Sequence, residues 1–558
     1  MKAPSVIKVY ANSDEATIVW KYSGNIKDCW GFAIYRKHKG QPDSQAEALH
    51  TGVGFQGDPH TDGETQPSTI WPIQKYIWID YYVQTGDVVS YRVVPMIHSG
   101  TQLQEADDKA TDWSDWVTVG NPPGVEAYFN RGLVSSQFLA KRLSTVPDAE
   151  KKKTLLTNLN DVNSKIRNFM GGDLLQALYN LLKEVTDNKN LQLYGALYEL
   201  NEPELIRRLN ALGKRAHIIL ANGAFGAKDP DPQAVNAKLL THVDLTRRIV
   251  STPHFAHNKF MIVTDKSGTK ETAVKVLTGS TNWTTNGVFT QVNNAVILHD
   301  PKVAAYYKAE WDAIKADCDQ NGKGLYSKKY EDFNNSVRTA PQIKTFFTPV
   351  QKEIDLDEAD SHIRAAKQGI LFLMFKPGVE GKSRMLYDTI MEMSKNKQLL
   401  INGVLNGDPG TAQHPTITFM HKNQQQQGNL DVVLPASIGA AFESWMKEIG
   451  IQNVTIHSKI IVIDPFSANP VLMTGSHNMG GKASASNDDN LNIIIGNTAL
   501  TQAYAINIMG VYHHYRWRFF RSRTDGSPSW EGNVKNDQWQ DWYKTGDKAK
   551  EINFWLPS

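Results

Sequence analysis

Two similar segments dominate the sequence: HNKFMIVTD at residues 257–265 and HSKIIVID at residues 457–464. Each copy has a histidine and a lysine two residues apart, then an apolar run that ends near an acid. A Gly-Ser-x-Asn tetrapeptide follows each copy and begins at Gly279 or Gly475. A repeat that served packing alone would reproduce its apolar positions. This one also reproduces its polar residues, which indicates a chemical role.

The apolar run of each copy predicts a buried strand. Alternate side chains of an extended strand share a face, so the histidine and lysine of each copy point the same way. The runs at residues 260–263 and 460–463 are apolar on both faces, as in a strand buried between layers. The tetrapeptide adds a tight turn, a hydroxyl and an amide, whose donors suit phosphate oxygens.

Two such strands facing each other would surround one anion with two histidines, two lysines and two asparagines. One histidine can then attack phosphorus while the other protonates the leaving oxygen. Each piece alone has a plainer interpretation, because His-x-Lys is common at strand ends and Gly-Ser-x-Asn is common in turns. Both pieces occur twice in the same order, and this favours the catalytic interpretation.

The two copies resemble the His-x-Lys-x4-Asp and Gly-Ser-x-Asn motifs of the phospholipase D superfamily, over roughly residues 125–525. The second copy matches in full, with His457, Lys459, Asp464, Gly475, Ser476 and Asn478. The resemblance implies the catalytic residues His257, Lys259, His457 and Lys459. It also implies the phosphate-binding residues Asn282, Asn478, Ser280 and Ser476.

The first copy departs from the motif at its acid. Thr264 stands where the motif has Asp, and Asp265 follows one residue late. Strand alternation gives Thr264 the orientation of Asp464, so Asp265 faces the other way unless a bulge re-aims it. The motif Asp is regarded as mainly structural in this family, so Asp464 and Asp265 are assigned supporting roles and activity is still expected.

A further acid lies downstream of the second copy. The run at residues 487–491 is placed where family members carry an acid that hydrogen-bonds a catalytic imidazole, and Asp489 is the candidate. The matching stretch of the first half, residues 291–295, has an amide instead. An acid on a histidine nitrogen fixes its tautomer and raises its basicity, so we expect the two histidines to differ. A solvated loop position is the alternative for Asp489.

The resemblance implies a two-step phosphodiester transfer. His257 attacks phosphorus to give a phosphohistidine, and His457 protonates the departing alcohol and then activates water or another alcohol. This assignment rests on the resemblance, and the reverse stays open. Because Lys259 and Lys459 already neutralise the phosphate, we expect no metal or other cofactor in the chemistry.

The chain has 558 residues, and its 60 basic and 58 acidic residues give a formal charge of +2. That balance argues against a dedicated nucleic-acid binder. The two cysteines, Cys29 and Cys318, exclude a disulfide scaffold.

No apolar run is long enough to span a bilayer, and the first residues lack a hydrophobic signal core. We expect a secreted or exported protein, with a cytoplasmic location as the alternative.

The sequence predicts a β-sandwich followed by a duplicated α/β unit. Apolar and polar residues alternate in six segments before residue 120, and residues 16–36 resemble the early strands of a fibronectin type III sandwich with Trp20 in its core. Strands and helices then alternate, which indicates two α/β/α halves with mostly parallel sheets. The predicted domains are residues 1–121, 122–345 with the His257 motif, and 346–558 with the His457 motif and an aromatic tail.

Fold and motif leave the substrate open, because the same site serves phospholipases, nucleases and phosphatidyl transferases. Size, balanced charge and aromatic-rich loops favour a phospholipase D that cleaves glycerophospholipid headgroups at a membrane surface or micelle, with transphosphatidylation as a further reaction. A nuclease or other phosphodiesterase is the alternative. Minimal nucleases of the family carry one motif per chain and dimerise, whereas this chain carries two, so we expect a monomer. Complete His-Lys pairs argue against a non-catalytic scaffold.

Overall fold

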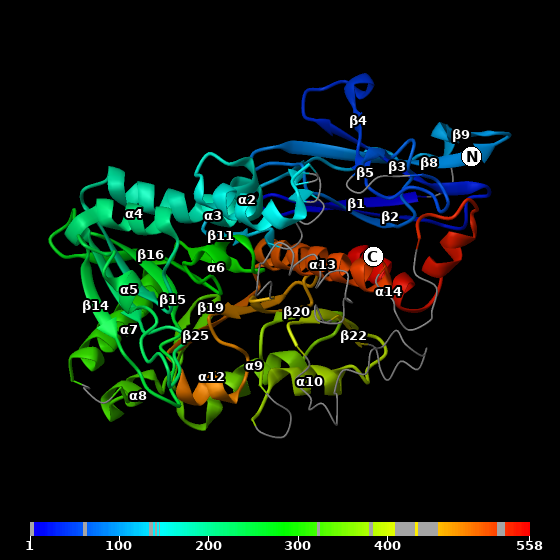
Figure 1. Cartoon of the computed structure of the whole chain (residues 1–558). Coiled ribbons are helices and arrows are strands. Elements are labelled where there is room, and N and C mark those ends of the chain that lie inside the picture. The colour runs from blue at the N-terminus through cyan, green and yellow to red at the C-terminus, as the bar shows by residue number, and fades with distance from the viewer. Residues whose placement is uncertain are drawn as a thin grey trace.

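The computed structural model describes residues 5–59, 64–132, 138–139, 142–143, 145–320, 324–378, 383–407, 430–433, 456–521 and 531–557. A β-rich N-terminal region lies beside two α/β halves, each built around its own large sheet (Figure 1). Among the described helices, none has the length and apolar character needed to cross a membrane.

The N-terminal region is a sandwich of two antiparallel sheets, as predicted. One sheet has the order β1-β2-β7, and the other has the order β10-β8-β3-β4 with β9 paired to β8. Trp20 is fully buried in the core between them and packs edge-on against Phe32 at 5.5 Å. The elements are β1 (Ser5–Ala11), β2 (Ala16–Tyr22), β3 (Cys29–His38), η1 (Asp43–Gln45), β4 (Glu47–Ala48), β5 (His50–Thr51), β6 (Gln66–Pro67), β7 (Ile77–Asp80), β8 (Val88–Ser99), β9 (Gln102–Glu105), η2 (Asp107–Lys109) and β10 (Val117–Thr118).

The first α/β half has a seven-stranded sheet of order β11-β17-β16-β15-β12-β13-β14. Helices α3 and α4 pack on one face and α7 on the other. The strands are β11 (Val125–Phe129), β12 (Leu191–Leu197), β13 (Ala216–Ala221), β14 (Asp244–Arg248), β15 (Lys259–Asp265), β16 (Thr272–Gly279) and β17 (Asn294–Leu298). The helices are α2 (Asp148–Asn160), α3 (Lys165–Asp187), α4 (Pro203–Leu212), η4 (Gly213–Arg215), α5 (Ala234–Ala237), α6 (Thr285–Phe289), α7 (Pro301–Gln320) and α8 (Lys328–Asn334).

The second half repeats this arrangement in an eight-stranded sheet of order β18-β19-β25-β24-β23-β20-β21-β22. Helices α9 and α10 pack on one face and α13 on the other. The strands are β18 (Arg338–Ala340), β19 (Ile343–Thr348), β20 (Gly369–Met374), β21 (Leu400–Leu405), β22 (Leu430–Val433), β23 (Lys459–Ile463), β24 (Val471–Gly475) and β25 (Asp489–Ile495). The helices are η5 (Gln351–Glu353), α9 (Ile354–Arg364), α10 (Leu386–Met393), α12 (Gly481–Ser486) and α13 (Thr498–Arg521).

The α/β class is confirmed, but the expectation of mostly parallel sheets is wrong. Only β12-β13-β14 and β20-β21-β22 run parallel, and every other pairing in the two sheets is antiparallel. The physical reason is the short connection after each motif strand. A hairpin joins β15 to β16 and β23 to β24, whereas a parallel neighbour needs a crossover of a dozen or more residues.

Helix α4 shows how local sequence sets an element. The Glu202 side chain accepts a hydrogen bond from the Leu205 amide and caps the helix, and Pro203 occupies its first turn. Gly213 ends the helix with a φ of 62°, which glycine adopts without strain. The local sequence therefore determines both ends of α4.

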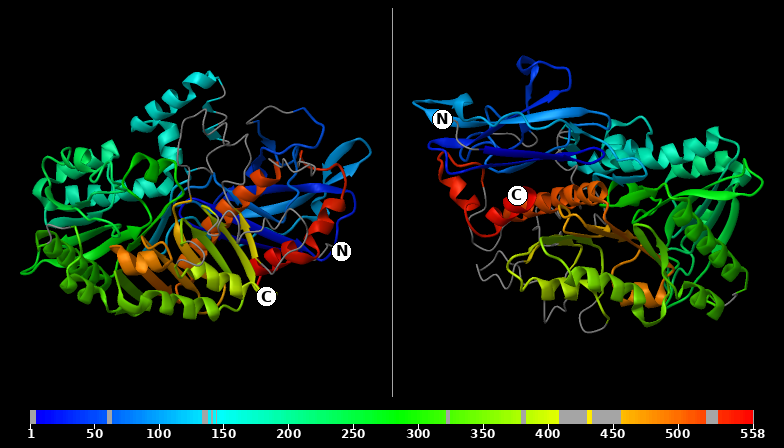
Figure 2. Two further views of the ribbon diagram at one scale, coloured as in Figure 1. Left: turned by 60° about the horizontal axis from the view of Figure 1, so that its bottom comes forward. Right: turned by 180° about the vertical axis from the view of Figure 1, so that it is seen from behind.

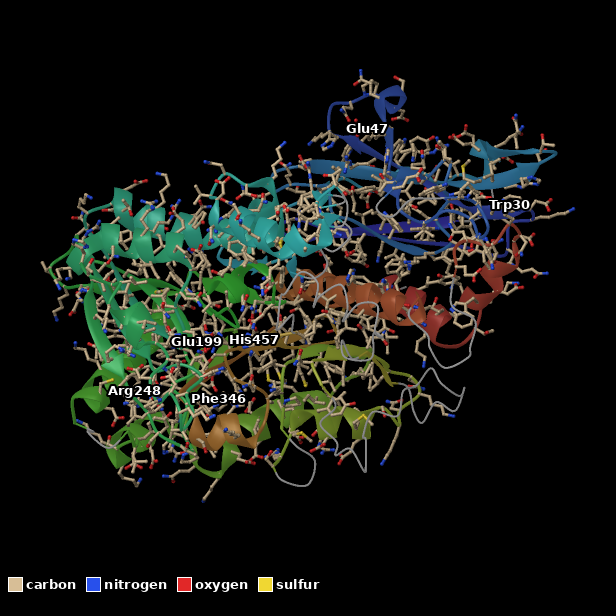
Figure 3. The ribbon with its side chains drawn as sticks, viewed as in Figure 1. Trp30, Glu47, Glu199, Arg248, Phe346 and His457 are labelled. Carbon is tan, nitrogen blue, oxygen red and sulfur yellow. The ribbon has the colours of Figure 1, made fainter. Side chains whose placement is uncertain are left out.

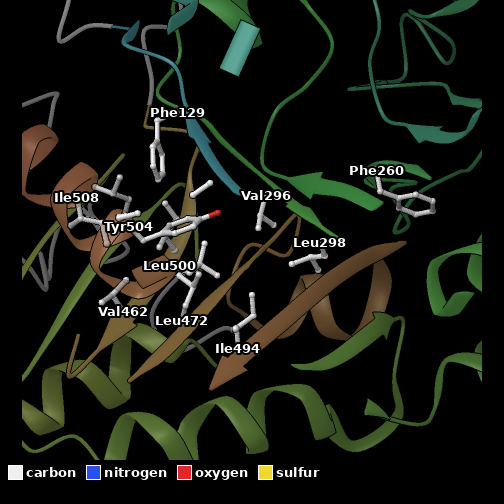
Figure 4. Packing of buried hydrophobic residues seen from close by; sticks show 14 of the residues in the cluster. Phe129, Phe260, Val296, Leu298, Val462, Leu472, Ile494, Leu500, Tyr504 and Ile508 are labelled. Atoms are coloured by element: carbon white, nitrogen blue, oxygen red, sulfur yellow. The ribbon is translucent and has the colours of Figure 1, made fainter. Parts of the chain in front are cut away.

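The two halves share one core. Helices α7 and α13 contribute to a single apolar cluster that contains residues of both sheets, including Val296, Leu298, Leu472 and Ile494 (Figure 4). Helix α13 also lies between the sandwich and the second sheet, as the rear view in Figure 2 shows. The two halves therefore form one packed unit, and the sandwich packs against this unit through α13.

The aromatic tail joins the sandwich to the second half. It forms η7 (Gln538–Tyr543) and α14 (Gly546–Trp555). Trp539 donates a hydrogen bond to the Cys29 carbonyl at 2.9 Å, and Trp555 is fully buried against Phe466. The tail therefore contacts both the sandwich and the second half.

The acids at the ends of the two motif strands have different surroundings. Asp464 accepts hydrogen bonds from the backbone amides of Lys367, Gln368 and Gly369 at 2.7–2.9 Å, which fixes the start of β20. Thr264 is buried in the corresponding register, whereas Asp265 faces outward and accepts from the Ser267 amide at 2.7 Å.

A bulge is present beside Thr264, but it leaves the alternation of β15 intact. Val263 pairs with Lys275 and Thr264 pairs with Ala273, so the extra residue lies on β16. The parity argument for Thr264 and Asp265 is confirmed.

We predict that Asp464→Asn lowers the free energy of unfolding by about 1–3 kcal/mol, because an amide cannot accept from three backbone donors as a carboxylate does. Asp265→Asn should leave the unfolding midpoint unchanged, because its carboxylate serves only an exposed turn. Thermal unfolding of both variants measures the difference. Equal losses in the two variants would contradict the outward placement of Asp265.

Candidate active site

The two motif histidines lie at the junction of the halves, and both are buried. The segments that carry them are cross-paired. Phe255 bridges to Asn487, and Ile456 bridges to Val292. The His257 amide donates to the Asp488 carbonyl at 2.9 Å, and the His457 amide donates to the Val292 carbonyl at 3.0 Å. Each half therefore holds the other half's histidine by its backbone.

The imidazole of His257 is oriented by an acid from the second half. Its Nδ1 lies 2.8 Å from Asp489 Oδ1, and Asp489 is fully buried. An ionised carboxylate only accepts hydrogen bonds, so Nδ1 carries the proton and the Nε2 lone pair is free. The structure thus places Asp489 on the histidine of the opposite half.

The imidazole of His457 meets neutral acceptors instead. Its Nδ1 lies 2.9 Å from Asn293 Oδ1 and 3.0 Å from the Ser280 carbonyl. Asn293 presents its oxygen because its amide nitrogen donates to the Gly287 carbonyl at 2.8 Å. His457 therefore has the same tautomer as His257 but lacks a charged partner.

The two lysines have equivalent positions in the two copies. Lys259 Nζ donates to the His257 carbonyl at 2.6 Å and lies 4.7 Å above the Tyr198 ring. Lys459 Nζ likewise donates to the carbonyl of its own histidine and lies 4.8 Å above the Phe375 ring. Each aromatic ring also packs edge-on against the imidazole of its half. The repeat in the sequence is therefore a repeat in space.

Burial lowers the pKa of all four groups, and neighbouring cationic groups add to the effect at His257, His457 and Lys459. Burial lowers the pKa of His257 to about 4, although the Asp489 carboxylate opposes the shift. Burial holds the pKa of Lys259 below its usual range. Burial and then the neighbouring cationic groups hold the pKa values of His457 and Lys459 well below their usual ranges. A bound anion would favour the protonated forms, so the site is suited to a phosphate.

Gly279 and Gly475 are required by close backbone contacts. Their φ angles are 148° and 153°, and a side chain at either position would collide with the carbonyl of Asn294 or Asn490. The serines that follow are fully buried. Ser280 Oγ donates to Asn293 Oδ1 at 2.7 Å, and Ser476 Oγ donates to Asp489 Oδ1 at 2.6 Å. The serines, expected to bind phosphate, thus contact the groups that orient the histidines.

The asparagines of the two tetrapeptides keep unused hydrogen-bonding capacity. Asn282 Nδ2 donates to Glu199 Oε2 at 3.1 Å, and its Oδ1 has no hydrogen-bond partner among the described residues. The Oδ1 atom of Asn478 is likewise buried without a partner in that part of the chain. Both amides can still bind a ligand.

The sequence did not indicate two groups around the site. One is Glu199, described above. The other is Arg248, whose Nε lies 3.0 Å from Asp488 Oδ2 and whose Nη1 pairs with Asp317. This buried pairing fixes Asp488, whose carbonyl holds the His257 amide. The only sign of this pairing in the sequence is Asp488 itself, the acid directly before Asp489.

A family model described as "Cardiolipin synthase, PLD-like domain" matches residues 188–315 and 360–508. These two segments contain the two motif copies and all the hydrogen-bonding groups on the two histidines. No curated protein matches the chain.

Several solved structures are similar to the chain at low identity. Phosphatidylserine synthase from Haemophilus influenzae has 11% identity and a TM-score of 0.40, and the match covers 61% of this chain and 84% of that one. Polyphosphate kinase from Porphyromonas gingivalis has 9% identity and a TM-score of 0.39, with 91% and 77% covered. Yeast tyrosyl-DNA phosphodiesterase has 11% identity and a TM-score of 0.35, with 57% and 86% covered.

We predict that Asp489→Asn lowers the pKa of His257 below about 4, because the carboxylate is the group that opposes the effect of burial. The ring should also lose its single tautomer, since an amide can present either oxygen or nitrogen to Nδ1. Nuclear magnetic resonance of labelled histidines measures both. Asp265→Asn is the matched control and should change neither, and an unchanged His257 in Asp489→Asn would contradict the assignment.

Proposed function

The chain belongs to the phospholipase D superfamily of phosphodiesterases and phosphotransferases, and we propose that it cleaves the headgroup phosphodiester of glycerophospholipids through a phosphohistidine. The observation that carries the proposal is the pair of histidines held in one tautomer, one by Asp489 and one by Asn293. Because Nδ1 is bound in each ring, the two Nε2 atoms remain for the reaction, and a two-step displacement requires one unprotonated Nε2 to attack and one protonated Nε2 to supply a proton.

In the first step His257 Nε2 attacks phosphorus, and the bond from phosphorus to the headgroup oxygen breaks. The imidazole becomes positively charged, and the Asp489 carboxylate on Nδ1 stabilises that charge. The departing oxygen takes the proton from Nε2 of His457, whose ring is doubly protonated when the phosphate is bound and becomes neutral in this step. His457 is the better acid because its partner, Asn293, is neutral. The charge asymmetry therefore supports His257 as the nucleophile.

In the second step the neutral His457 takes a proton from water, and the water oxygen attacks phosphorus. The bond between phosphorus and His257 Nε2 breaks, which gives phosphatidic acid and restores both histidines. An alcohol in place of water gives transphosphatidylation by the same route. Apart from the lipid, the only reactant consumed is the water or the alcohol.

Charge on the phosphate oxygens is stabilised by side chains in this mechanism. We assign this role to Lys259, Lys459, Asn282 and Asn478, and the phosphate restores the full charge of the lysines that burial disfavours. Two ammonium groups supply the charge that a divalent cation supplies in other phosphodiesterases, so the proposed chemistry requires none.

A lipid substrate is favoured over nucleic acid by the nearly balanced charge, since a formal charge of +2 over 558 residues gives little attraction for a polyanion. The description of the matching family model names cardiolipin synthase, which also supports a phospholipid. The alternative function, to be tested against the phospholipase, is a nuclease or other phosphodiesterase.

We predict that His257→Ala and His457→Ala each lower kcat by at least about 10³-fold without altering the unfolding midpoint, because neither histidine can replace the other. An activated nitrophenyl diester separates their roles, since its leaving group needs no proton. His457→Ala should release about one equivalent of nitrophenol and retain phosphorus on His257, detected by mass spectrometry. Phosphorus on His457 in the other variant would reverse the assignment.

We also predict that activity survives EDTA. Headgroup release from phosphatidylcholine vesicles and nicking of plasmid DNA are measured side by side in chelator, with the nitrophenyl diester as a soluble control. Release without nicking supports a phospholipase, and nicking alone supports the nuclease alternative. Loss of activity on the soluble diester, restored by one defined ion, would contradict a metal-independent step.

A further inference from the structure

Glu199 breaks the pseudo-symmetry of the site. It follows β12, where Leu197 pairs with Lys259, just as Met374 of β20 pairs with Lys459. The position that corresponds to Glu199 in the second half is therefore Lys376. Glu199 is half-buried, whereas Lys376 is exposed. Glu199, labelled in Figure 3, thus places a carboxylate against Asn282, whereas the corresponding position of the second half carries an ammonium.

A carboxylate beside a phosphate site is unfavourable unless a positive group accompanies the phosphate. The charge of Lys259 offsets part of this repulsion, but its ammonium donates to the His257 carbonyl and makes no hydrogen bond to Glu199 in the described structure. Glu199 accepts two hydrogen bonds, from Asn282 Nδ2 at 3.1 Å and from the Ala224 amide at 3.2 Å. Two carboxylate oxygens offer about four acceptor positions, so capacity remains.

Asn282 provides a second acceptor at the same place. A carboxylate cannot donate, so Glu199 obliges Asn282 to turn its nitrogen toward it and leaves Asn282 Oδ1 facing elsewhere. That oxygen is buried and has no partner in the described structure, which costs free energy unless a ligand donates to it. Glu199 and Asn282 together therefore require a positively charged donor of hydrogen bonds.

The nearby aromatic rings do not favour a quaternary ammonium. Tyr198 directly precedes Glu199, its ring lies 6.4 Å from that of Phe255, and both rings could provide faces for a cation. Lys259 already lies 4.7 Å above the Tyr198 ring, and Lys482 lies 4.5 Å above the Phe255 ring. The available recognition is by oxygen atoms, which suits an ammonium that carries N–H groups.

The position of Asn282 shows which part of the substrate reaches Glu199. The Ser280 carbonyl, two residues before Asn282, accepts from His457 Nδ1 at 3.0 Å. His457 is the proposed acid on the leaving oxygen, so the loop of Asn282 lies on the side of the departing headgroup.

We propose that Glu199 is a specificity-determining residue that, with Asn282 Oδ1, binds the protonated primary amine of the leaving headgroup. This inference rests on the proposed function and adds its substrate class: phospholipids whose headgroup is a primary amino alcohol. Glu199 would bind the amine, and it takes no part in the displacement at phosphorus.

The test compares phosphatidylethanolamine with phosphatidylglycerol in the same mixed micelles. Glu199→Gln keeps an acceptor for Asn282 but removes the charge, so kcat/KM for phosphatidylethanolamine should fall about 10- to 100-fold, the usual worth of a charge-assisted hydrogen bond. The value for phosphatidylglycerol should be unchanged. Glu392→Gln, which removes an exposed carboxylate paired with Arg364, is the control and should preserve both values.

An equal fall in kcat/KM for both lipids would show that Glu199 only positions Asn282. No change in kcat/KM for either lipid would show that Glu199 does not contact the substrate. Both results overturn the inference. Phosphatidylcholine is the third arm, and a loss there as large as for phosphatidylethanolamine would contradict the requirement for an N–H donor.

Calorimetric titration with phosphoethanolamine and glycerol phosphate separates this inference from the proposed function. Tighter binding of phosphoethanolamine that disappears in Glu199→Gln supports the amine site even if no lipid is cleaved, in which case the proposed function alone fails. Lipid cleavage with equal binding of the two probes would preserve the function and overturn the amine site.

Discussion

The site depends on an exchange of hydrogen bonds between the two halves. The backbone amide and Nδ1 of His257 are bound by Asp488 and Asp489 of the second half, and those of His457 are bound by Val292 and Asn293 of the first. The Nδ1 hydrogen bond of each histidine therefore comes from the opposite half. The continuous core beneath, shared by α7, α13 and both sheets, holds these four contacts in register. The two copies of the motif form one site because the halves are packed together in this way.

Near-symmetry of the fold accompanies asymmetry of charge. The lysines, aromatic rings and glycines have the same contacts in the two copies. Two pairs of corresponding positions differ in charge: Asp489 corresponds to Asn293, and Glu199 corresponds to Lys376. A symmetric site would give two histidines of equal basicity and no preferred direction of attack. One carboxylate on one imidazole is enough to separate a nucleophile from an acid, because it stabilises the positively charged ring.

The motif residues and their facing could be predicted from the sequence, because strand alternation is local. The same parity placed Thr264 inside and Asp265 outside. Strand direction could not be predicted in this way, since an alternation of strands and helices does not reveal which neighbours a hairpin joins. Asp489 was recognisable as a candidate, but its pairing with His257 of the opposite half depends on the tertiary structure and could not be predicted from local sequence. Glu199 carries no motif, and only its contact with Asn282 distinguishes it.

The contact between the two ends of the described chain bears on how the protein folds. The Tyr10 hydroxyl donates to the Trp555 carbonyl at 2.6 Å, across 545 residues of sequence, and Trp555 is fully buried there. Closing so long a loop costs conformational entropy that only prior structure can reduce, so contacts of this separation form late. The sandwich and both halves must therefore be in place before α14 docks, and burial of Trp555 marks the completion of folding.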